Sequence, residues 1–269
     1  MTAISALISK DWIAAASDSL LTEFDPNSNQ IKHIEFKKSK IVPIRKFKAA
    51  AAYWGLAKVG QWRTYDFLKA IAADADKYNS FEDFAVNMRN KLRAKIDGIK
   101  FNNPIHRGIG IHLIGYENIN NKQIPELFLI CNYTDPTYTK VGDLSISRNL
   151  YKTLPDEFKK NGISLDEQRN QIVEFLDSGR LFIFNNGDPA LFNPSANTIH
   201  AMFKTALDRK VMNKDYNNYM RLASRPIEMI KKVQNDFFEK DYVRVGGQIH
   251  HLLITERGDF LSDTGDNEF

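Results

Sequence analysis

Three residues near the start of the chain have the types and the spacing to activate a hydroxyl nucleophile: Thr2, Asp18 and Lys40. A threonine hydroxyl is protonated at neutral pH, but at a chain start the α-amine of the same residue can serve as its general base. That amine titrates at about 8, close to the operating pH, which suits proton transfer. Removal of Met1, which a small second residue favours, would expose the amine of Thr2.

Asp18 and Lys40 meet the next requirement of this chemistry. A cation beside the nucleophile lowers the proton affinity of the site, and a buried carboxylate keeps that cation charged and oriented. A backbone N–H must also hold the oxyanion that forms during acyl transfer. Gly55, at the end of a run of small residues, can supply one, because glycine lets a substrate backbone approach closely.

Each of these residues has a common alternative explanation when it is taken alone. Thr2 is then an ordinary strand residue, Asp18 a turn or cap residue, and Lys40 a solvated charge among basic neighbours. The hypothesis therefore depends on their combination and on the strands that would bring them together.

The strands expected around these residues place them at strand ends. Alternating apolar residues predict a strand over the first nine residues, and a second strand over 12–16 returns antiparallel to it. This hairpin would bring Asp18 beside the chain start. Lys40 opens a third strand over 40–44, and a fourth over 47–54 ends at Gly55.

The rest of the chain indicates two sheets and several helices. Helices are expected over 62–72 and 81–96, in a charged stretch over 149–180, over 199–206, and in a last helix opened by Pro226. Further strands are expected over 108–116, 126–133, 181–184 and 245–255. This order favours antiparallel sheets flanked by helices over a doubly wound parallel sheet. Two sheets face to face, with a helix pair outside each, would bury both apolar faces.

The start of the chain resembles that of a proteasome β-type subunit. The likeness consists of the early threonine, an aspartate 16 residues later (18 − 2), the run Lys40-Ile41-Val42-Pro43-Ile44, and a small-residue strand ending in Gly55. The chain is also similar to bacterial proteasome-related peptidases. A late stretch, 241–249, resembles the family's Asp-x-x-Ser-Gly-Gly segment. The likeness covers residues 1–75 and 226–258, and between them it depends on element order alone.

The resemblance implies an α+β fold, a four-layer αββα sandwich of two antiparallel sheets known as the N-terminal nucleophile hydrolase fold. Residues 1–269 would form a single domain, with a helical insertion at about 149–180. Thr2 would be the nucleophile of a threonine-type peptidase or amidohydrolase, Asp18 and Lys40 its activating pair, and Gly55 the oxyanion donor. The resemblance further implies a homo-oligomer, ring-like or stacked, that acts on peptide or protein substrates and accommodates an unfolding partner.

The chain departs from the family pattern at the supporting hydroxyl groups. One supporting serine would fall near Asn186, and the other, just before the late glycine pair, is replaced by Val245 or Arg244. Asp241 lies one residue further from that pair than the pattern expects. Asn186 and Asp241 therefore remain candidate supporting residues, and the changes bear on the catalytic rate more than on the fold. Tyr53, two residues before the candidate oxyanion glycine, is expected at the wall of a shallow substrate pocket.

Two other functions fit the same fold. One is a catalytically silent subunit of a proteasome-like assembly, which the missing hydroxyl groups favour. Against it, such subunits carry a helical extension before the first strand, whereas Thr2 opens the strand directly. The other is a small-molecule amidase, for which a deep pocket walled by Tyr53 and residues 149–180 would be the sign.

Composition excludes several other classes. The net charge of +4 is small, and the basic cluster over 37–48 is less dense than a nucleic-acid surface would need. The single cysteine, Cys131, cannot form an internal disulfide and is expected to be an inert core thiol, which fits a reducing cytoplasm. No apolar run approaches the roughly 20 residues of a membrane helix, and we expect no signal peptide. His250 and His251 face opposite sides of a strand, so neither a metal nor another cofactor is expected.

Overall fold

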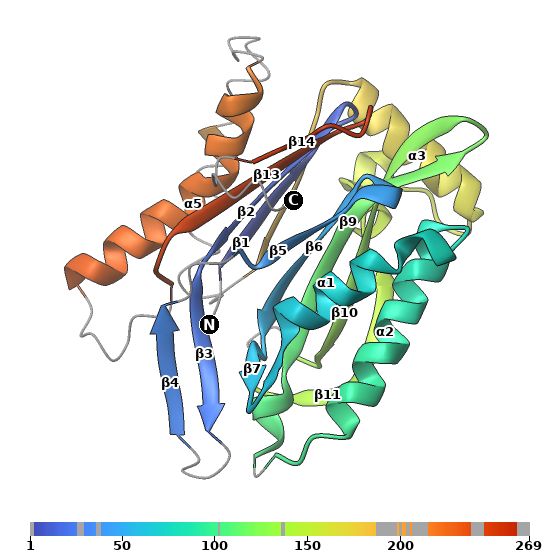
Figure 1. Ribbon diagram of the computed structural model, residues 1–269. Coiled ribbons are helices and arrows are strands. Elements are labelled where there is room, and N and C mark those ends of the chain that lie inside the picture. The colour runs from blue at the N-terminus through green and yellow to red at the C-terminus, as the bar shows by residue number, and fades with distance from the viewer. Residues whose placement is uncertain are drawn as a thin grey trace.

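The computed structural model describes residues 3–25, 30–35, 39–101, 103–135, 138–186, 198, 201–202, 205, 215–237 and 245–262, with side chains for all of these except 21–25 and 30–35. Within these ranges the protein is a mixed α+β structure with two large antiparallel sheets, a smaller third sheet and four α-helices (Figure 1).

The first sheet has the strand order β12-β1-β2-β13-β14, and every neighbouring pair is antiparallel. A hairpin turn joins β1 to β2. In that turn the hydroxyl oxygen of Ser9 accepts the backbone N–H groups of Asp11 and Trp12. The strands are β1 (Ile4–Ile8), β2 (Trp12–Asp18), β12 (Phe182–Asn186), β13 (Ile249–Thr255) and β14 (Phe260–Leu261).

The second sheet has the order β11-β10-β9-β6-β5, again antiparallel throughout. Its strands are β5 (Ile41–Ile44), β6 (Ala49–Gly55), β9 (Ile109–Ile119), β10 (Lys122–Tyr133) and β11 (Val141–Arg148). The smaller sheet, in the order β4-β3-β7-β8, contains β3 (Leu20–Asp25), β4 (Gln30–Glu35), β7 (Lys58–Val59) and β8 (Trp62–Arg63).

The α-helices are α1 (Thr64–Ala73), α2 (Phe81–Asp97), α3 (Leu165–Asp177) and α5 (Tyr216–Phe237). Ser80 caps α2 by accepting the N–H of Asp83, and Ser164 forms a reciprocal capping box with Glu167 at the start of α3. Short 3-10 turns connect other elements: η1 (Arg45–Phe47), η2 (Ala75–Lys77), η3 (Pro104–Arg107), η4 (Tyr151–Thr153) and η5 (Asp156–Phe158).

Three hydrophobic clusters define the layers (Figure 1). The helix α5 packs on one face of the first sheet, and the other face of that sheet packs against the second sheet. The helices α1 and α2 cover the outer face of the second sheet. Strand alternation explains this division, because successive side chains of β1, β2, β6 and β9 enter different clusters. The arrangement is compatible with a sandwich of helix, sheet, sheet and helix layers.

Residues 149–180 contribute to the core between the sheets. Leu150, Leu154 and three residues of α3, Ile172, Phe175 and Leu176, belong to the cluster that separates the two sheets. This segment therefore closes one edge of the sandwich and is built into its packing.

Several expectations from the sequence need correction. Pro226 does not open the last helix but lies inside α5, because buried residues on both sides of it, such as Ala223 and Ile227, pack on the same sheet. That packing outweighs the roughly 3 kcal/mol that an interior proline costs.

Other strands and helices also differ from expectation. The last long strand begins at Ile249, and 245–248 form a loop. The strands β3, β4 and β11 were not expected, and among the described residues only α5 covers the first sheet. Most of the helix expected over 199–206 lies outside the described residues.

In the part of the chain that the structure describes, no helix has both the length and the apolar character needed to cross a membrane.

Candidate active site

Asp18 lies at the end of β2 and receives three hydrogen bonds that come from distant parts of the chain. The amide of Ala3 donates to its Oδ1 at 3.0 Å, and the ammonium of Lys40 donates to the same oxygen at 2.8 Å. The amide of Gly246 donates to its Oδ2 at 3.1 Å. The carboxylate therefore joins β1, the start of β5 and the loop before β13.

Lys40 and Asp18 form a completely buried ion pair, since both side chains have 0% relative exposure. The ammonium also donates to the carbonyl oxygen of Leu20. Burial lowers the pKa of Lys40 from its ordinary value, and the charge and hydrogen bond of Asp18 act in the opposite direction. Because Asp18 belongs to the first sheet and Lys40 leads into the second, the pair ties the two sheets together at this end.

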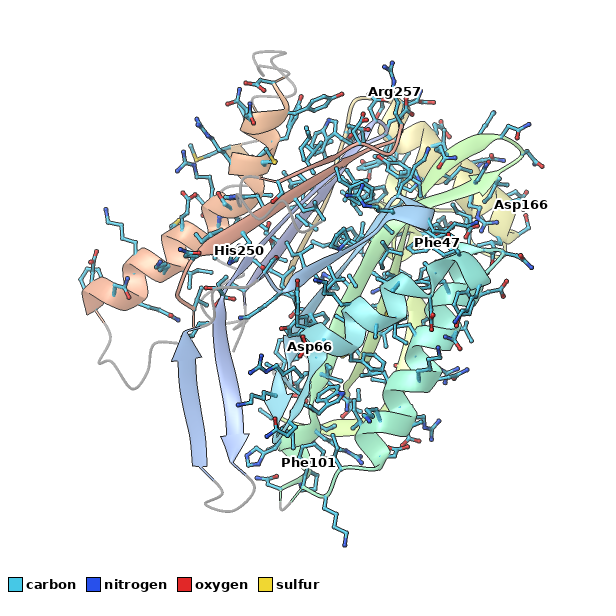
Figure 2. All side chains as sticks on the ribbon, viewed as in Figure 1. Phe47, Asp66, Phe101, Asp166, His250 and Arg257 are labelled. Atoms are coloured by element: carbon cyan, nitrogen blue, oxygen red, sulfur yellow. The ribbon has the colours of Figure 1, made fainter. Side chains whose placement is uncertain are left out.

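The loop before β13 is fitted closely to the end of β2. The carbonyl of Gly246 accepts the N–H groups of Ser19 and Leu20, both at 3.2 Å. Gly247 has a φ of +71°, and a Cβ there would lie 2.2 Å from the hydroxyl oxygen of Ser19. Glycine at position 247 is thus required both by the backbone conformation and by close approach to β2, whereas a Cβ on Gly246 would meet its nearest neighbour, Leu20, at 3.6 Å. His250 marks this end of β13, and Arg257 lies beyond its other end (Figure 2).

Thr2, the candidate nucleophile, lies outside the described residues. Its neighbour Ala3 is completely buried and is held from both sides, because its carbonyl accepts the N–H of Asp18 at 3.1 Å. The structure therefore describes the carboxylate, the ammonium and the first amide after Thr2, and it brings all three together. The assignment of Thr2 itself stays a prediction.

Gly55 ends β6 with a φ of +81°, a left-handed conformation that favours glycine. A Cβ at this position would lie 2.3 Å from the carbonyl oxygen of Gly108 and 2.8 Å from the hydroxyl of Tyr133. The N–H of the next residue, Leu56, donates to that same carbonyl at 2.7 Å. The turn at Gly55 is thus specified by its neighbours, while its role as an oxyanion donor stays a prediction.

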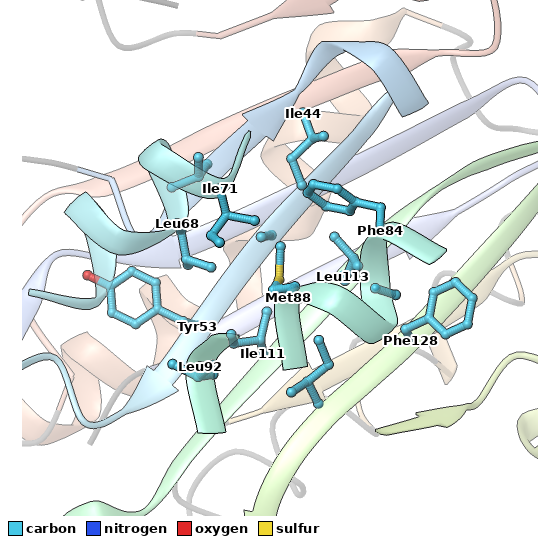
Figure 3. Packing of buried hydrophobic residues seen from close by; sticks show 14 of the residues in the cluster. Ile44, Tyr53, Leu68, Ile71, Phe84, Met88, Leu92, Ile111, Leu113 and Phe128 are labelled. Carbon is cyan, nitrogen blue, oxygen red and sulfur yellow. The ribbon is translucent and has the colours of Figure 1, made fainter. Parts of the chain in front are cut away.

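Tyr53 is a core residue and does not line an open pocket, which corrects the expectation from the sequence. Its side chain is 1% exposed and packs in the cluster beneath α1 and α2, beside Leu68 and Leu92 (Figure 3). The alternation of β6 is the reason, because Ala51 and Tyr53 face the helices whereas Ala52 faces the first sheet. Burial raises the pKa of Tyr53 well above its ordinary value.

Asn186, the candidate supporting residue at the end of β12, takes part in a second contact between the sheets. Its Oδ1 accepts the hydroxyl of Tyr138 at 2.5 Å, and its Nδ2 lies 3.5 Å from Nε2 of His112 on β9. In the sheet it lies opposite Ile4 of the neighbouring strand β1, close to the chain start. The structure thus places Asn186 near Ala3, although in a polar cluster of its own.

Of the other two candidate supporting positions, the structure describes only Val245. Asp241 and Arg244 lie outside the described residues. Val245 is completely buried, and its N–H donates to the side-chain carbonyl of Gln234 on α5 at 2.9 Å. The position before the glycine pair therefore anchors the loop to α5 through its backbone.

Sequence reasoning missed three residues that border the candidate site: Trp54, His112 and Tyr138. Trp54 precedes Gly55, and its ring centroid lies 4.9 Å from that of His112. A signal for His112 does exist, since it is a polar residue within the apolar strand Ile111-His112-Leu113. Tyr138 lies in the loop after β10 and carries no such signal.

Comparisons with known proteins add no relative. A scan against models of protein families finds no match to this chain, and a search of curated proteins finds no similar sequence. Among the described residues, no group of three or more histidine, cysteine, aspartate or glutamate side chains is placed to hold a metal ion.

Proposed function

We propose that the protein is an amide-bond hydrolase whose nucleophile is the N-terminal threonine Thr2, exposed by removal of Met1. The observation that carries the proposal is the fully buried pair of Asp18 and Lys40, joined to the amide of Ala3. A buried ion pair is costly and adds little stability compared with apolar packing, so its presence at this point favours a functional role.

The distance along the chain is short enough for the pair to act on Thr2. Consecutive Cα atoms are about 3.8 Å apart, and the amide nitrogen of Ala3, which donates to Asp18 at 3.0 Å, is bonded to the carbonyl carbon of Thr2. The ammonium of Lys40 shares the same carboxylate oxygen. Its positive charge would disfavour protonation of the nearby α-amine and keep that amine available as a base.

The reaction follows from these groups. The α-amine takes the hydroxyl proton of Thr2 as its Oγ attacks the substrate carbonyl, and the N–H of Gly55 binds the resulting oxyanion. Collapse of the tetrahedral intermediate breaks the amide bond, and the leaving amine takes the proton back from the α-ammonium. Water, activated by the same amine, then hydrolyses the ester on Oγ and releases the acid.

The proposal extends to the fold and the assembly. The two packed antiparallel sheets with helices outside them support the N-terminal nucleophile hydrolase fold, a four-layer αββα sandwich. The remaining parts follow from the resemblance alone: a single domain, a cytoplasmic homo-oligomer in rings or stacked rings, peptide or protein substrates, and an unfolding partner.

The test is covalent labelling of the natively made protein by a peptide epoxyketone, which reacts with both the hydroxyl and the free α-amine of an N-terminal threonine. Intact mass should show loss of Met1 and one adduct per chain, and peptide mapping should place the adduct on Thr2. Thr2→Ala should abolish the adduct. Thr153→Ala, the same change on the η4 turn, should leave it intact.

Two results would refute the enzyme. Retention of Met1 would block the α-amine, and a labelled Thr2→Ala variant would show that the nucleophile is elsewhere. If Met1 is removed and the folded chain takes no adduct, the catalytically silent subunit becomes the better description.

A further inference from the structure

A second contact between the sheets lies on the other side of β1 from the ion pair. In the first sheet β1 is flanked by β2 and β12. At the end near Ala3, β2 contributes Asp18, which reaches Lys40, and β12 contributes Asn186, which reaches His112 on β9. The start of β1 therefore lies between two contacts that join the sheets. We call the ion pair of Asp18 and Lys40 the charged link, and the contact of Asn186 with His112 the uncharged link.

With the amide of Asn186 oriented as in this structure, the hydrogen bonds of the uncharged link assign the proton of His112 to one ring nitrogen. Burial raises the pKa of Tyr138 to about 12, so its hydroxyl keeps its proton and donates to Oδ1 of Asn186 at 2.5 Å. The amide of Asn186 then presents Nδ2–H to Nε2 of His112. Burial lowers the pKa of His112 to about 4, so the ring is neutral at pH 7 and its proton is on Nδ1.

Two N–H donors of this cluster have no acceptor among the described residues. They are Nδ1 of His112 and Nε1 of Trp54, whose rings lie edge to face at 4.9 Å. The residues are 5% and 4% exposed, respectively. A buried donor without an acceptor carries its full desolvation penalty, so two side by side indicate a place where an acceptor binds.

The position of these donors relates them to the candidate site and to two partly exposed tyrosines. Trp54 immediately precedes Gly55, and the hydroxyl of Tyr133 lies 2.8 Å from where a Cβ of Gly55 would be. The ring centroids of Tyr133 and Tyr138 lie 5.0 Å apart with the ring planes tilted by 57°, and both residues are partly exposed. The cluster thus extends from the candidate oxyanion glycine, past the buried donors, to the protein surface.

We propose that Trp54 and His112 bind an uncharged carbonyl acceptor of the substrate, of the carboxamide type found in a glutamine side chain. This inference rests on the proposed function and adds the substrate class. Two N–H donors match the two lone pairs of one carbonyl oxygen. Among the described residues, the side chains recorded in contact with His112 are those of Trp54, Phe184 and Asn186, and all three are uncharged. None of them would neutralise a buried carboxylate, which would therefore cost far more here than an amide.

The test compares three internally quenched peptides in which the scissile bond is flanked on both sides by glutamine, by glutamate or by leucine. Placing the probe residue on both sides makes the result independent of which side the donors face, and product masses identify the bond that is cut. The glutamine peptide should have a kcat/KM at least tenfold above the other two. Trp54→Phe and His112→Phe should each lower that value about tenfold, with little effect on the leucine peptide.

Trp62→Phe is the matched control, because Trp62 has a buried Nε1–H without an acceptor among the described residues but lies on β8. It should leave the preference for glutamine unchanged. The inference is overturned if glutamate or leucine is preferred, or if the two variants lower all three rates equally. Failure of the proposed function is distinct from this, since then no peptide is cut and no epoxyketone adduct forms on Thr2. A unit-stoichiometry adduct on each variant shows that its site is folded.

Discussion

Replacement of Asp18 by asparagine removes the negative charge of the buried ion pair with Lys40. At the observed N–O separation of 2.8 Å, the direct attraction is about 6 kcal/mol for an effective dielectric constant of 20. Desolvation of both charges offsets much of this in the intact pair. In the variant the ammonium keeps its desolvation cost and loses the attraction, so we expect a loss of about 3–5 kcal/mol in unfolding free energy.

The companion variants separate the pair from its surroundings. Lys40→Met should cost less than Asp18→Asn, because the carboxylate still accepts the amides of Ala3 and Gly246. The double variant removes both charges, so it should be about 1–3 kcal/mol more stable than the sum of the single changes implies. Urea unfolding at pH 7 measures all of these values, provided that the slope with denaturant stays constant.

The matched control is the exposed ion pair of Lys10 and Asp177, with an N–O distance of 2.6 Å and side chains 56% and 47% exposed. Asp177→Asn should change the unfolding free energy by only about 0–1 kcal/mol, since water screens this pair. Equal losses of unfolding free energy for Asp18→Asn and Asp177→Asn would show that burial does not determine the strength of the pair of Asp18 and Lys40. That result would contradict the importance given to this pair in the candidate site.

Two further outcomes follow from single positions. Gly55→Ala should destabilise the protein by well over 2 kcal/mol, as judged by urea unfolding, because the added Cβ would lie 2.3 Å from a backbone carbonyl. Gly162→Ala, with a φ of +71° but open space around it, should cost only the roughly 1–2 kcal/mol of the left-handed conformation. For His112, a folded pKa of about 4 against an ordinary 6.5 means that the contribution of this residue to stability is constant above pH 6.5 and falls by up to about 3 kcal/mol towards pH 4. His112→Phe should flatten that part of the stability profile, and an unchanged profile would contradict the assignment.

The candidate site could be predicted from sequence where local patterns determine the register. The period of the first two strands and the turn between them fix which residue of β2 lies opposite the chain start, so the position of Asp18 followed from the hairpin alone. Lys40 and Gly55 were placed correctly at strand ends for the same reason. These are short-range features, and the sequence contains them in full.

What could not be predicted depends on partners distant in the chain. The strand β11 is rich in polar residues and owes its conformation to pairing with β10 at the sheet edge. His112 and Asn186 are 74 residues apart and meet only because two sheets pack face to face. Pro226 shows the opposite case, in which a strong local signal for a helix start is overridden by packing on both sides of it.

The three donors to Asp18 have a consequence for the order in which the chain folds. The bonds to Ala3 and Lys40 span 15 and 22 residues, whereas the bond to Gly246 spans 228. Such a long loop closes late, after the elements rich in local contacts have formed. A chain still being synthesised can make the first two bonds but lacks the third until its last strands appear. Completion of the carboxylate's surroundings thus requires that the loop before β13 has been made, and a chain that stops before Gly246 would lack one of the donors to Asp18.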